Sequence, residues 1–157
     1  MNPSPRDQIA FRLARQRVAC LLIAFGMLAA VPLHAASCNL SVQPVAFGNY
    51  DFQSSEDLES VGHVIVRCDT STGFTIALSP GSGTFAARSM QSGTHRLFYN
   101  LYTDATRTLV WGDGSAGSGV VGDSGTEVDR TVYGNVPAGQ NPYAGMYGDA
   151  VTVTLSF

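Results

Sequence analysis

The chain has 157 residues, with nine arginines, no lysine and twelve acidic residues, for a formal net charge of −3 at pH 7. The absence of lysine excludes Schiff-base chemistry, a P-loop lysine and lysine–asparagine cross-links. After residue 36 the five remaining arginines are scattered among eleven acidic residues, so the chain lacks the basic stripe that nucleic-acid binding requires. We therefore expect no nucleic-acid partner.

The first 36 residues have the three-part layout of a secretory signal. Arg12, Arg15 and Arg17 precede an apolar run at 18–31, and small residues follow at Ala35 and Ala36. The run is shorter than the ~20 residues that a membrane-spanning helix needs. We expect residues 1–36 to be a signal peptide, cleaved after Ala35 or Ala36, and residues 37–157 to form one exported domain with no stable membrane insertion.

Cys38 and Cys68 are the two cysteines of this expected mature domain. An even count in an oxidising compartment favours a disulfide between them. A lipid on Cys38 is the alternative. A lipoprotein signal carries a leucine-like side chain three residues before the modified cysteine, and here that position is Ala35. Lipidation would also leave Cys68 as an unpaired thiol. We expect the disulfide.

Alternation with a period of two organises the rest of the chain. The segments 63–68, 74–78, 97–102 and 150–157 each place apolar side chains on one face, as half-buried strands do. Glycine-rich and serine-rich pieces at 79–83, 111–119, 122–126 and 137–145 are typical of turns, and "CDTSTG" at 68–73 is expected to be a polar turn between two strands. The pattern predicts an all-β sandwich, with a small closed barrel as the competing architecture.

Ser124 lies in "GDSG" at 122–125, which resembles the nucleophile segment of chymotrypsin-like proteases. A nucleophilic serine needs a histidine base that is itself oriented by a carboxylate. Only His63 and His95 follow the leader, and His63 lies in mid-strand on the face opposite the core positions. We expect a glycine-rich turn here and no enzymatic activity.

Loop carboxylates are the remaining candidates for a metal site. Asp104, Asp113, Asp123 and Asp129 do not follow the EF-hand spacing, and the histidines and cysteines lack the close spacing of a zinc site. We expect no metal and no cofactor, while calcium binding by the loop carboxylates stays open.

An ordered series of short motifs covers the expected mature chain. It consists of Cys38, "FGNYD" at 47–51, "VRC" at 66–68, "RSM" at 88–90, "LFYNLYTD" at 97–104, "WGDG" at 111–114 and "GMYGDAVTVTLSF" at 145–157. The series resembles the spore coat protein U domain family, the pilin-like subunits of archaic chaperone-usher fimbriae. This resemblance assigns structural roles to Phe47, Gly48, Tyr50, Tyr99, Asn100, Tyr102, Trp111, Gly112, Asp113, Tyr147 and Asp149.

The resemblance implies an incomplete immunoglobulin-like β-sandwich that lacks its last strand and polymerises by donor-strand exchange. It also implies three partners, namely a periplasmic pilus chaperone, an outer-membrane usher and sister pilin subunits, and export through the periplasm to the cell surface or an extracellular fimbria. A sandwich missing one strand exposes an apolar groove and an unpaired strand edge, which an added strand can fill. We expect the groove and the chaperone-facing edge to include Val151, Val153, Leu155 and Phe157.

The position of Cys38 predicts a place in the fibre. Cleavage after Ala35 or Ala36 leaves one or two residues ahead of Cys38, and therefore no N-terminal extension to donate. We expect a subunit that accepts a strand but gives none, at the tip or as a cap. The alternative is a non-polymerising spore-coat or cell-surface binding module whose aromatic residues Trp111 and Tyr143 contact a carbohydrate or another surface.

Overall fold

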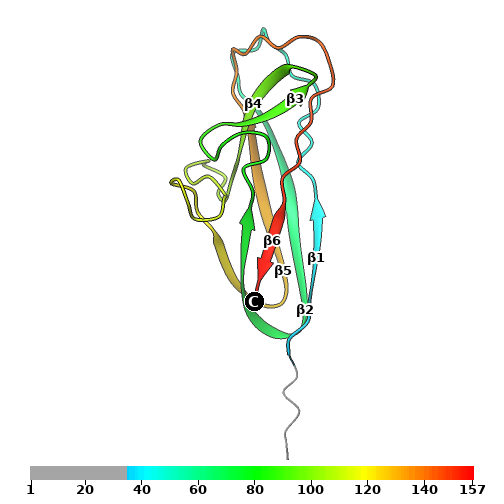
Figure 1. Cartoon of the computed structure of the whole chain (residues 1–157), viewed down its shortest axis with the longest axis vertical. Coiled ribbons are helices and arrows are strands. Elements are labelled where there is room, and N and C mark those ends of the chain that lie inside the picture. The colour runs from blue at the N-terminus through cyan, green and yellow to red at the C-terminus, as the bar shows by residue number, and fades with distance from the viewer. Residues whose placement is uncertain (1–34) are drawn as a thin grey trace, which may run out of the picture. The chain divides into compact units, whose positions relative to one another are not determined.

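The computed structural model describes residues 35–157; the basic and apolar parts of the expected leader, with Cys20 and His34, lie outside the described residues. The described part consists of strands and loops without a helix (Figure 1). The strands are β1 (Cys38–Gln43), β2 (Leu58–Leu78), β3 (Arg88–Ser92), β4 (His95–Tyr102), β5 (Val121–Val136) and β6 (Val153–Ser156). Over residues 35–157 no helix is long and apolar enough to cross a membrane.

The strands form a curled antiparallel sheet in the order β1-β2-β5-β4-β3, with β6 paired to β2 (Figure 1). β5 follows one edge of β2 between Leu58 and Ile76. The other edge of β2 pairs with β1 at residues 63–68 and with β6 at residues 75–78. Two strands therefore share one edge of β2, and they do not pair with each other anywhere in the described chain.

The two longest strands bend together, and two expected turns are wrong. "CDTSTG" at 68–73 does not end a strand, because β2 continues through it with a register shift between Arg67 and Thr72. "GDSGT" at 122–126 lies within β5 beside this shift, where Gly125 pairs with Thr72. A bulge bends a strand without ending it, and Gly125 adopts a φ of 155° that other residues rarely reach. The polar and glycine-rich composition of 68–73 and 122–126 therefore indicates a bend in two paired strands, and not two turns.

In β4 the alternation predicts the buried face correctly with one exception. Leu97, Tyr99 and Leu101 of β4 are buried, and Phe98 between them is exposed, as the period of two requires. Asn100 lies on the alternate face yet is also buried. It is buried because its amide donates to the carbonyl oxygen of Phe85, at 2.8 Å, and its Oδ1 accepts from Arg88.

Arg88 is a fully buried arginine whose charge is met by neutral oxygens. Its guanidinium donates to Asn100 Oδ1 at 2.7 Å and to the carbonyl oxygens of Trp111 and Ser79 at 2.7 and 2.9 Å. Burial lowers the pKa of Arg88 below its usual value, because the charged form loses its hydration. These bonds tie the loop before β3 and the loop after β4 to one another.

Trp111 corrects one expectation of the alternative function. Its side chain is 1% exposed, and its indole Nε1 donates to the carbonyl oxygen of Ile76 at 3.0 Å. A buried indole cannot contact a carbohydrate, so the expected surface role of Trp111 is wrong. Tyr143 is 71% exposed and stacks on His95, with 4.2 Å between the ring centroids.

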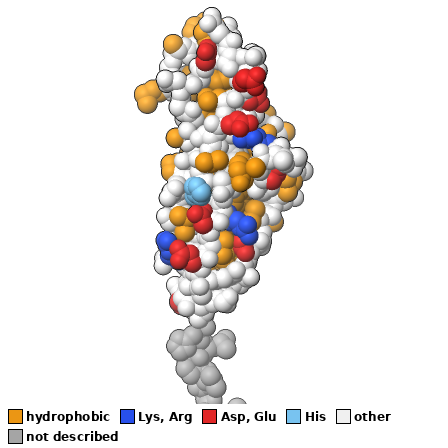
Figure 2. All heavy atoms as spheres, turned by 180° about the vertical axis from the view of Figure 1, so that it is seen from behind, with side chains coloured by type: hydrophobic (Ala, Val, Ile, Leu, Met, Phe, Trp, Pro, Cys, Tyr) orange, Lys and Arg blue, Asp and Glu red, His pale blue; other side chains and the backbone are white. Residues whose placement is uncertain are grey.

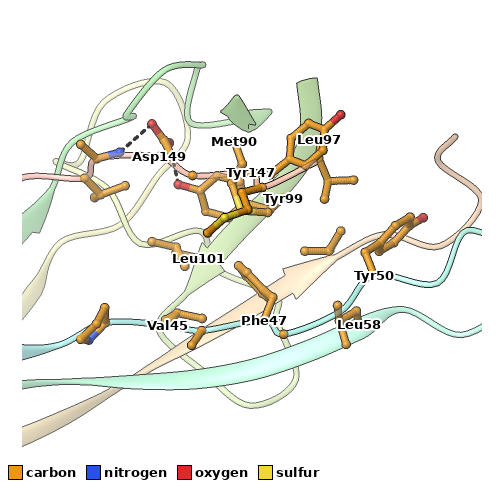
Figure 3. A pocket seen from close by; sticks show the side chains of 18 of the residues that line it. Val45, Phe47, Tyr50, Leu58, Met90, Leu97, Tyr99, Leu101, Tyr147 and Asp149 are labelled. Atoms are coloured by element: carbon orange, nitrogen blue, oxygen red, sulfur yellow. Dashed lines mark hydrogen bonds between the residues drawn. The ribbon is translucent and has the colours of Figure 1, made fainter. Parts of the chain in front are cut away.

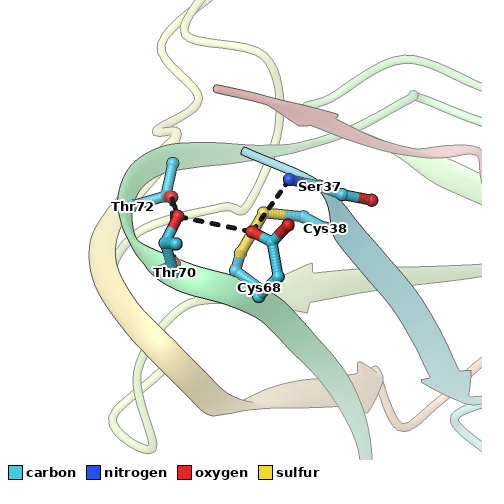
Figure 4. The surroundings of a disulfide bond; sticks show 6 residues. Ser37, Cys38, Cys68, Thr70 and Thr72 are labelled. Atoms are coloured by element: carbon cyan, nitrogen blue, oxygen red, sulfur yellow. Dashed lines mark hydrogen bonds between the residues drawn. A yellow bond between two sulfur atoms is a disulfide. The ribbon is translucent and has the colours of Figure 1, made fainter. Parts of the chain in front are cut away.

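The expected disulfide is confirmed. Cys38 and Cys68 are bonded and lie directly opposite each other in the pairing of β1 with β2, with 4.0 Å between their Cα atoms. Ser37 and Asp69 continue this pairing, because the amide of Asp69 donates to the carbonyl oxygen of Ser37 and the amide of Ser37 donates to the Asp69 carboxylate (Figure 4). Because the Cys38 sulfur is in the disulfide, it cannot also carry a lipid. The disulfide fixes the start of β1 to β2.

Replacing both cysteines by serine should lower the free energy of unfolding by about 3–4 kcal/mol, because the bond closes a long loop in the unfolded chain. The two cysteines are 30 residues apart. Urea unfolding, followed by the fluorescence of the single tryptophan, Trp111, measures the difference. Two titratable thiols in the exported native protein would contradict the pairing.

Candidate functional site

An open groove of about 970 Å³ lies between two stretches of chain on the inner side of the sheet (Figure 3). One wall is the segment 42–50, which leaves β1, and we call it the first wall. The other is the segment 142–153, which leads into β6, and we call it the second wall. The floor between them is apolar and comes from β2, β3, β4 and β5, with Val64, Leu78, Met90, Leu97, Leu101, Val132 and Val136.

The first wall has an unpaired backbone. Across residues 35–157, no backbone-to-backbone hydrogen bond joins residues 44–50 to another segment. Side chains fasten this segment instead. Ser60 Oγ donates to the carbonyl oxygen of Ala46 at 2.7 Å, and the Tyr50 hydroxyl donates to the carbonyl oxygen of Pro137 at 3.0 Å. Apart from the carbonyl oxygen of Ala46, the peptide groups of residues 44–50 are left free for another strand.

The second wall ends in a strand with one free edge. β6 pairs with residues 75–78 of β2 along one edge, and no strand of the described chain pairs with its other edge. Just before β6, the amide of Thr152 donates to Ser79 Oγ and the Thr152 carbonyl oxygen accepts from the Ser79 amide, both at 2.9 Å. These bonds hold the wall on the side away from the groove.

Apolar side chains of β1 face inward but stay exposed. Leu40 and Val42 lie opposite Val66 and Val64 in the register, and the two β2 residues are fully buried. Residues opposite each other share a face of the sheet. Leu40 and Val42 are nevertheless 37% and 46% exposed, because nothing in the described chain covers this part of the inner face.

A tyrosine and an aspartate fix the second wall to the floor (Figure 3). The Tyr99 hydroxyl donates to Asp149 Oδ2 at 2.7 Å, and the amide of Ser82 donates to Oδ1 at 2.9 Å. Burial and the bond to the carboxylate together raise the pKa of Tyr99 well above its usual value. Burial would raise the pKa of Asp149, but the hydrogen bonds from Tyr99 and Ser82 outweigh it and lower that pKa.

The structure brings most of the family-motif residues to the groove. Phe47, Gly48, Tyr50, Tyr99, Tyr147 and Asp149 line it. Asn100, Trp111 and Gly112 are buried behind the floor, Tyr102 is half-buried on β4, and Asp113 is exposed in a loop. The sequence did not indicate that Pro142 to Gly145, in the glycine-rich piece at 137–145 expected to be a turn, would form part of a wall.

The four residues expected at the groove and its edge divide into two pairs. Val151 and Val153 line the groove, and Leu155 is half-buried against the core. Phe157 is 60% exposed and does not line it. Burial alternates as expected from Val151 to Leu155, and Phe157 departs from the expected pattern.

Ser124 and His63 do not meet. Ser124 lies opposite Gly73 in the register and His63 lies opposite Thr131, so ten residues of β2 separate them. The imidazole Nδ1 of His63 is 2.9 Å from Asp129 Oδ1 on the outer face of the sheet. His63 is therefore out of reach of Ser124, and the protease-like motif is part of a bent strand.

The carboxylates distributed over the surface serve local structure. Asp104 accepts hydrogen bonds from the Thr106 hydroxyl and from the amides of Leu109 and Thr108, which lower its pKa. No group of three or more His, Cys, Asp or Glu side chains within residues 35–157 is placed to hold a metal ion. On the face shown in Figure 2, acidic and basic side chains lie in small mixed groups.

Comparison with known proteins connects the groove to a family. Residues 24–154 match the family model described as Spore Coat Protein U domain. Protein U of Myxococcus xanthus is 35% identical over 125 residues, which cover 71% of this chain and 70% of that protein.

Two solved structures match the chain to different degrees. The CsuC–CsuE chaperone–tip adhesion subunit pre-assembly complex from the archaic chaperone-usher Csu pili of Acinetobacter baumannii matches with a TM-score of 0.52 and 23% identity, over 78% of this chain. The chain spans 40% of the length of that matched chain. The Escherichia coli Hda pilus minor tip subunit HdaB matches with a TM-score of 0.42 and 20% identity, over 74% of this chain and 79% of that one. The fold is the expected incomplete immunoglobulin-like β-sandwich.

Tyr99→Phe should lower the free energy of unfolding by about 1–2 kcal/mol at neutral pH, because Asp149 loses a hydrogen bond while the ring stays in place. The lowered pKa of Asp149 means that its contribution is present above the unfolded-state pKa of about 4 and is lost as the pH falls through the lower folded-state value. The difference between the two proteins should therefore shrink in acid. Urea unfolding at several pH values measures it.

The matched control is Tyr143→Phe, which removes a hydroxyl from an exposed ring. It should leave stability unchanged. A difference between Tyr99→Phe and the unchanged protein that is constant down to the most acidic pH would contradict the role given to the Asp149 carboxylate.

Proposed function

The chain belongs to the Spore Coat Protein U domain family, and we propose that it is a secreted structural subunit of a chaperone-usher fimbria, without enzymatic activity, which accepts a donated β-strand in its groove. One observation carries this proposal. The groove has an apolar floor and is bordered by a first wall with unpaired peptide groups and by a β6 edge without a partner.

A β-strand is the ligand that these features favour. An extended segment in the groove can form main-chain hydrogen bonds to a wall on each side, which supply affinity. Its alternate side chains point to the floor and supply register. Such a strand would also cover Leu40 and Val42, whose exposure on an inner face is otherwise unfavourable.

The same exposed groove accounts for the proposed partners. A free apolar groove beside an open strand edge promotes aggregation, so the subunit needs a temporary occupant before assembly. A periplasmic pilus chaperone would fill that role, an outer-membrane usher would receive the subunit, and sister pilin subunits would replace the chaperone. The subunit would then pass through the periplasm to the cell surface or an extracellular fimbria.

The proposed place in the fibre depends on the expected cleavage after Ala35 or Ala36. Cys38 is already the first residue of β1 and is tied to Cys68. With cleavage there, one or two residues precede the disulfide, which is too short a segment to lie in the groove of a neighbour. The subunit would accept a strand without donating one and would stand at the tip or cap the fibre.

A synthetic peptide that copies the N-terminal alternating strand of a sister subunit should bind the chaperone-released protein. Val42→Glu should weaken this binding by about tenfold or more, because a carboxylate would lie where an apolar contact is needed. The control is Ser41→Glu, the next residue on β1 and on the opposite face. Fluorescence anisotropy of a labelled peptide measures both, and equal binding by the two variants would count against the groove.

The chaperone-released protein should form no homopolymer, because a subunit without a donor segment cannot fill the groove of a second copy. Size-exclusion chromatography after removal of the chaperone checks this, together with the mass of the mature N-terminus. Homopolymers that grow from protein beginning at Ala36 or Ser37 would contradict the acceptor-only position.

A further inference from the structure

The first wall keeps its place with few polar bonds. No backbone-to-backbone bond joins residues 44–50 to another segment of the described chain, although this segment borders the groove along its length. Val45 and Phe47 are half-buried and alternate with exposed neighbours, so these two side chains point toward the sheet. Apolar contact must therefore hold most of the segment.

Two buried glycines lie beneath these side chains. Gly62 is on the inner face of β2, where a Cβ atom would be 2.6 Å from the carbonyl oxygen of Gln43 and 2.9 Å from the amide nitrogen and Cγ2 of Val45. Gly134 is on the inner face of β5, where a Cβ atom would be 2.7 Å from Val45 Cγ1 and 2.8 Å from Phe47 Cζ. Carbon atoms in contact prefer separations of about 3.5–4.0 Å. Any larger residue at either position would collide with the first wall.

Close contacts, and not backbone conformation, require glycine at positions 62 and 134. Neither Gly62 nor Gly134 has a positive φ, so other residues could adopt the backbone conformation of either position. Glycine within a strand otherwise weakens it, and it is expected where another backbone approaches closely. The two positions form a notch in adjacent strands, and the first wall rests in it.

The notch also sets the distance between the walls. The ring of Phe47 reaches from the first wall to Tyr99, and the two rings meet edge to face with 5.8 Å between centroids (Figure 3). Tyr99 is in turn bonded to Asp149 of the second wall. The distance between the Phe47 ring and the backbone of Gly134 therefore determines how far the ring extends into the groove.

We propose that Gly62 and Gly134 determine the width of the groove by seating Val45 and Phe47, and that they are specificity-determining positions for the donated strand. This inference rests on the strand-accepting function proposed above. A methyl group at position 134 would raise the Phe47 ring from the floor into the space that the donated strand needs. Neither glycine lines the groove, so both act on the donated strand through the first wall.

Gly134→Ala should weaken binding of the sister-subunit peptide by about tenfold, which is within the usual cost of overpacking a well-packed site. The matched control is Gly122→Ala in the same strand, where a Cβ atom would meet nothing within 4 Å. It should bind within about twofold of the unchanged protein. Trp111 fluorescence and the absence of free thiols show that each variant keeps its fold.

Phe47→Leu provides the test of mechanism, because it removes the end of the ring without adding an atom. It should itself weaken binding, and Gly134→Ala should cost less in a Phe47→Leu background than in the unchanged protein. Binding of Gly134→Ala equal to that of the unchanged protein, or equal costs in both backgrounds, would overturn the proposal. Failure of the unchanged protein to bind the peptide would instead overturn the strand-accepting function, and the proposal with it.

Discussion

The unfilled position between the first wall and the free edge of β6 is the constraint on which the rest of the structure depends. β1 and β6 pair with the same edge of β2 at different heights, and no strand of the described chain lies beside both of them. Backbone groups and apolar side chains that a closed sandwich would bury therefore remain accessible. A polar peptide group is costly to bury without a partner, and exposed apolar surface is costly in water. Adding a strand satisfies both requirements at once.

The fold keeps the groove open by holding its walls from behind. Tyr99 and Ser82 hold Asp149, Ser79 holds Thr152, and the glycine notch holds the first wall, and none of these contacts uses a peptide group of β6. Arg88 supports this arrangement, because its guanidinium also donates to the carbonyl oxygen of Ser79. A site that is organised before binding loses less conformational entropy when its ligand arrives.

The sequence predicted the features that follow from local patterning. Alternation placed Val64, Leu97 and Tyr99 in the core, and cysteine counting identified the disulfide. It failed where polar, flexible residues serve a long-range purpose. "CDTSTG" looks like a turn because its composition permits one, whereas pairing with β5 up to Arg67 and again from Thr72 keeps it within a bent strand. The burial of Arg88 could not be predicted, because its carbonyl partners come from loops distant in sequence.

Amide hydrogen exchange with and without a sister-subunit donor peptide tests the central claim most directly. The free protein should exchange rapidly at residues 44–50 and slowly at the paired residues of β2 and β5, because exchange follows hydrogen bonding and local opening. Addition of the peptide should protect amides in 44–50 and along β6, on both sides of the groove. Protection confined to another surface, or none while the peptide is bound, would contradict the account.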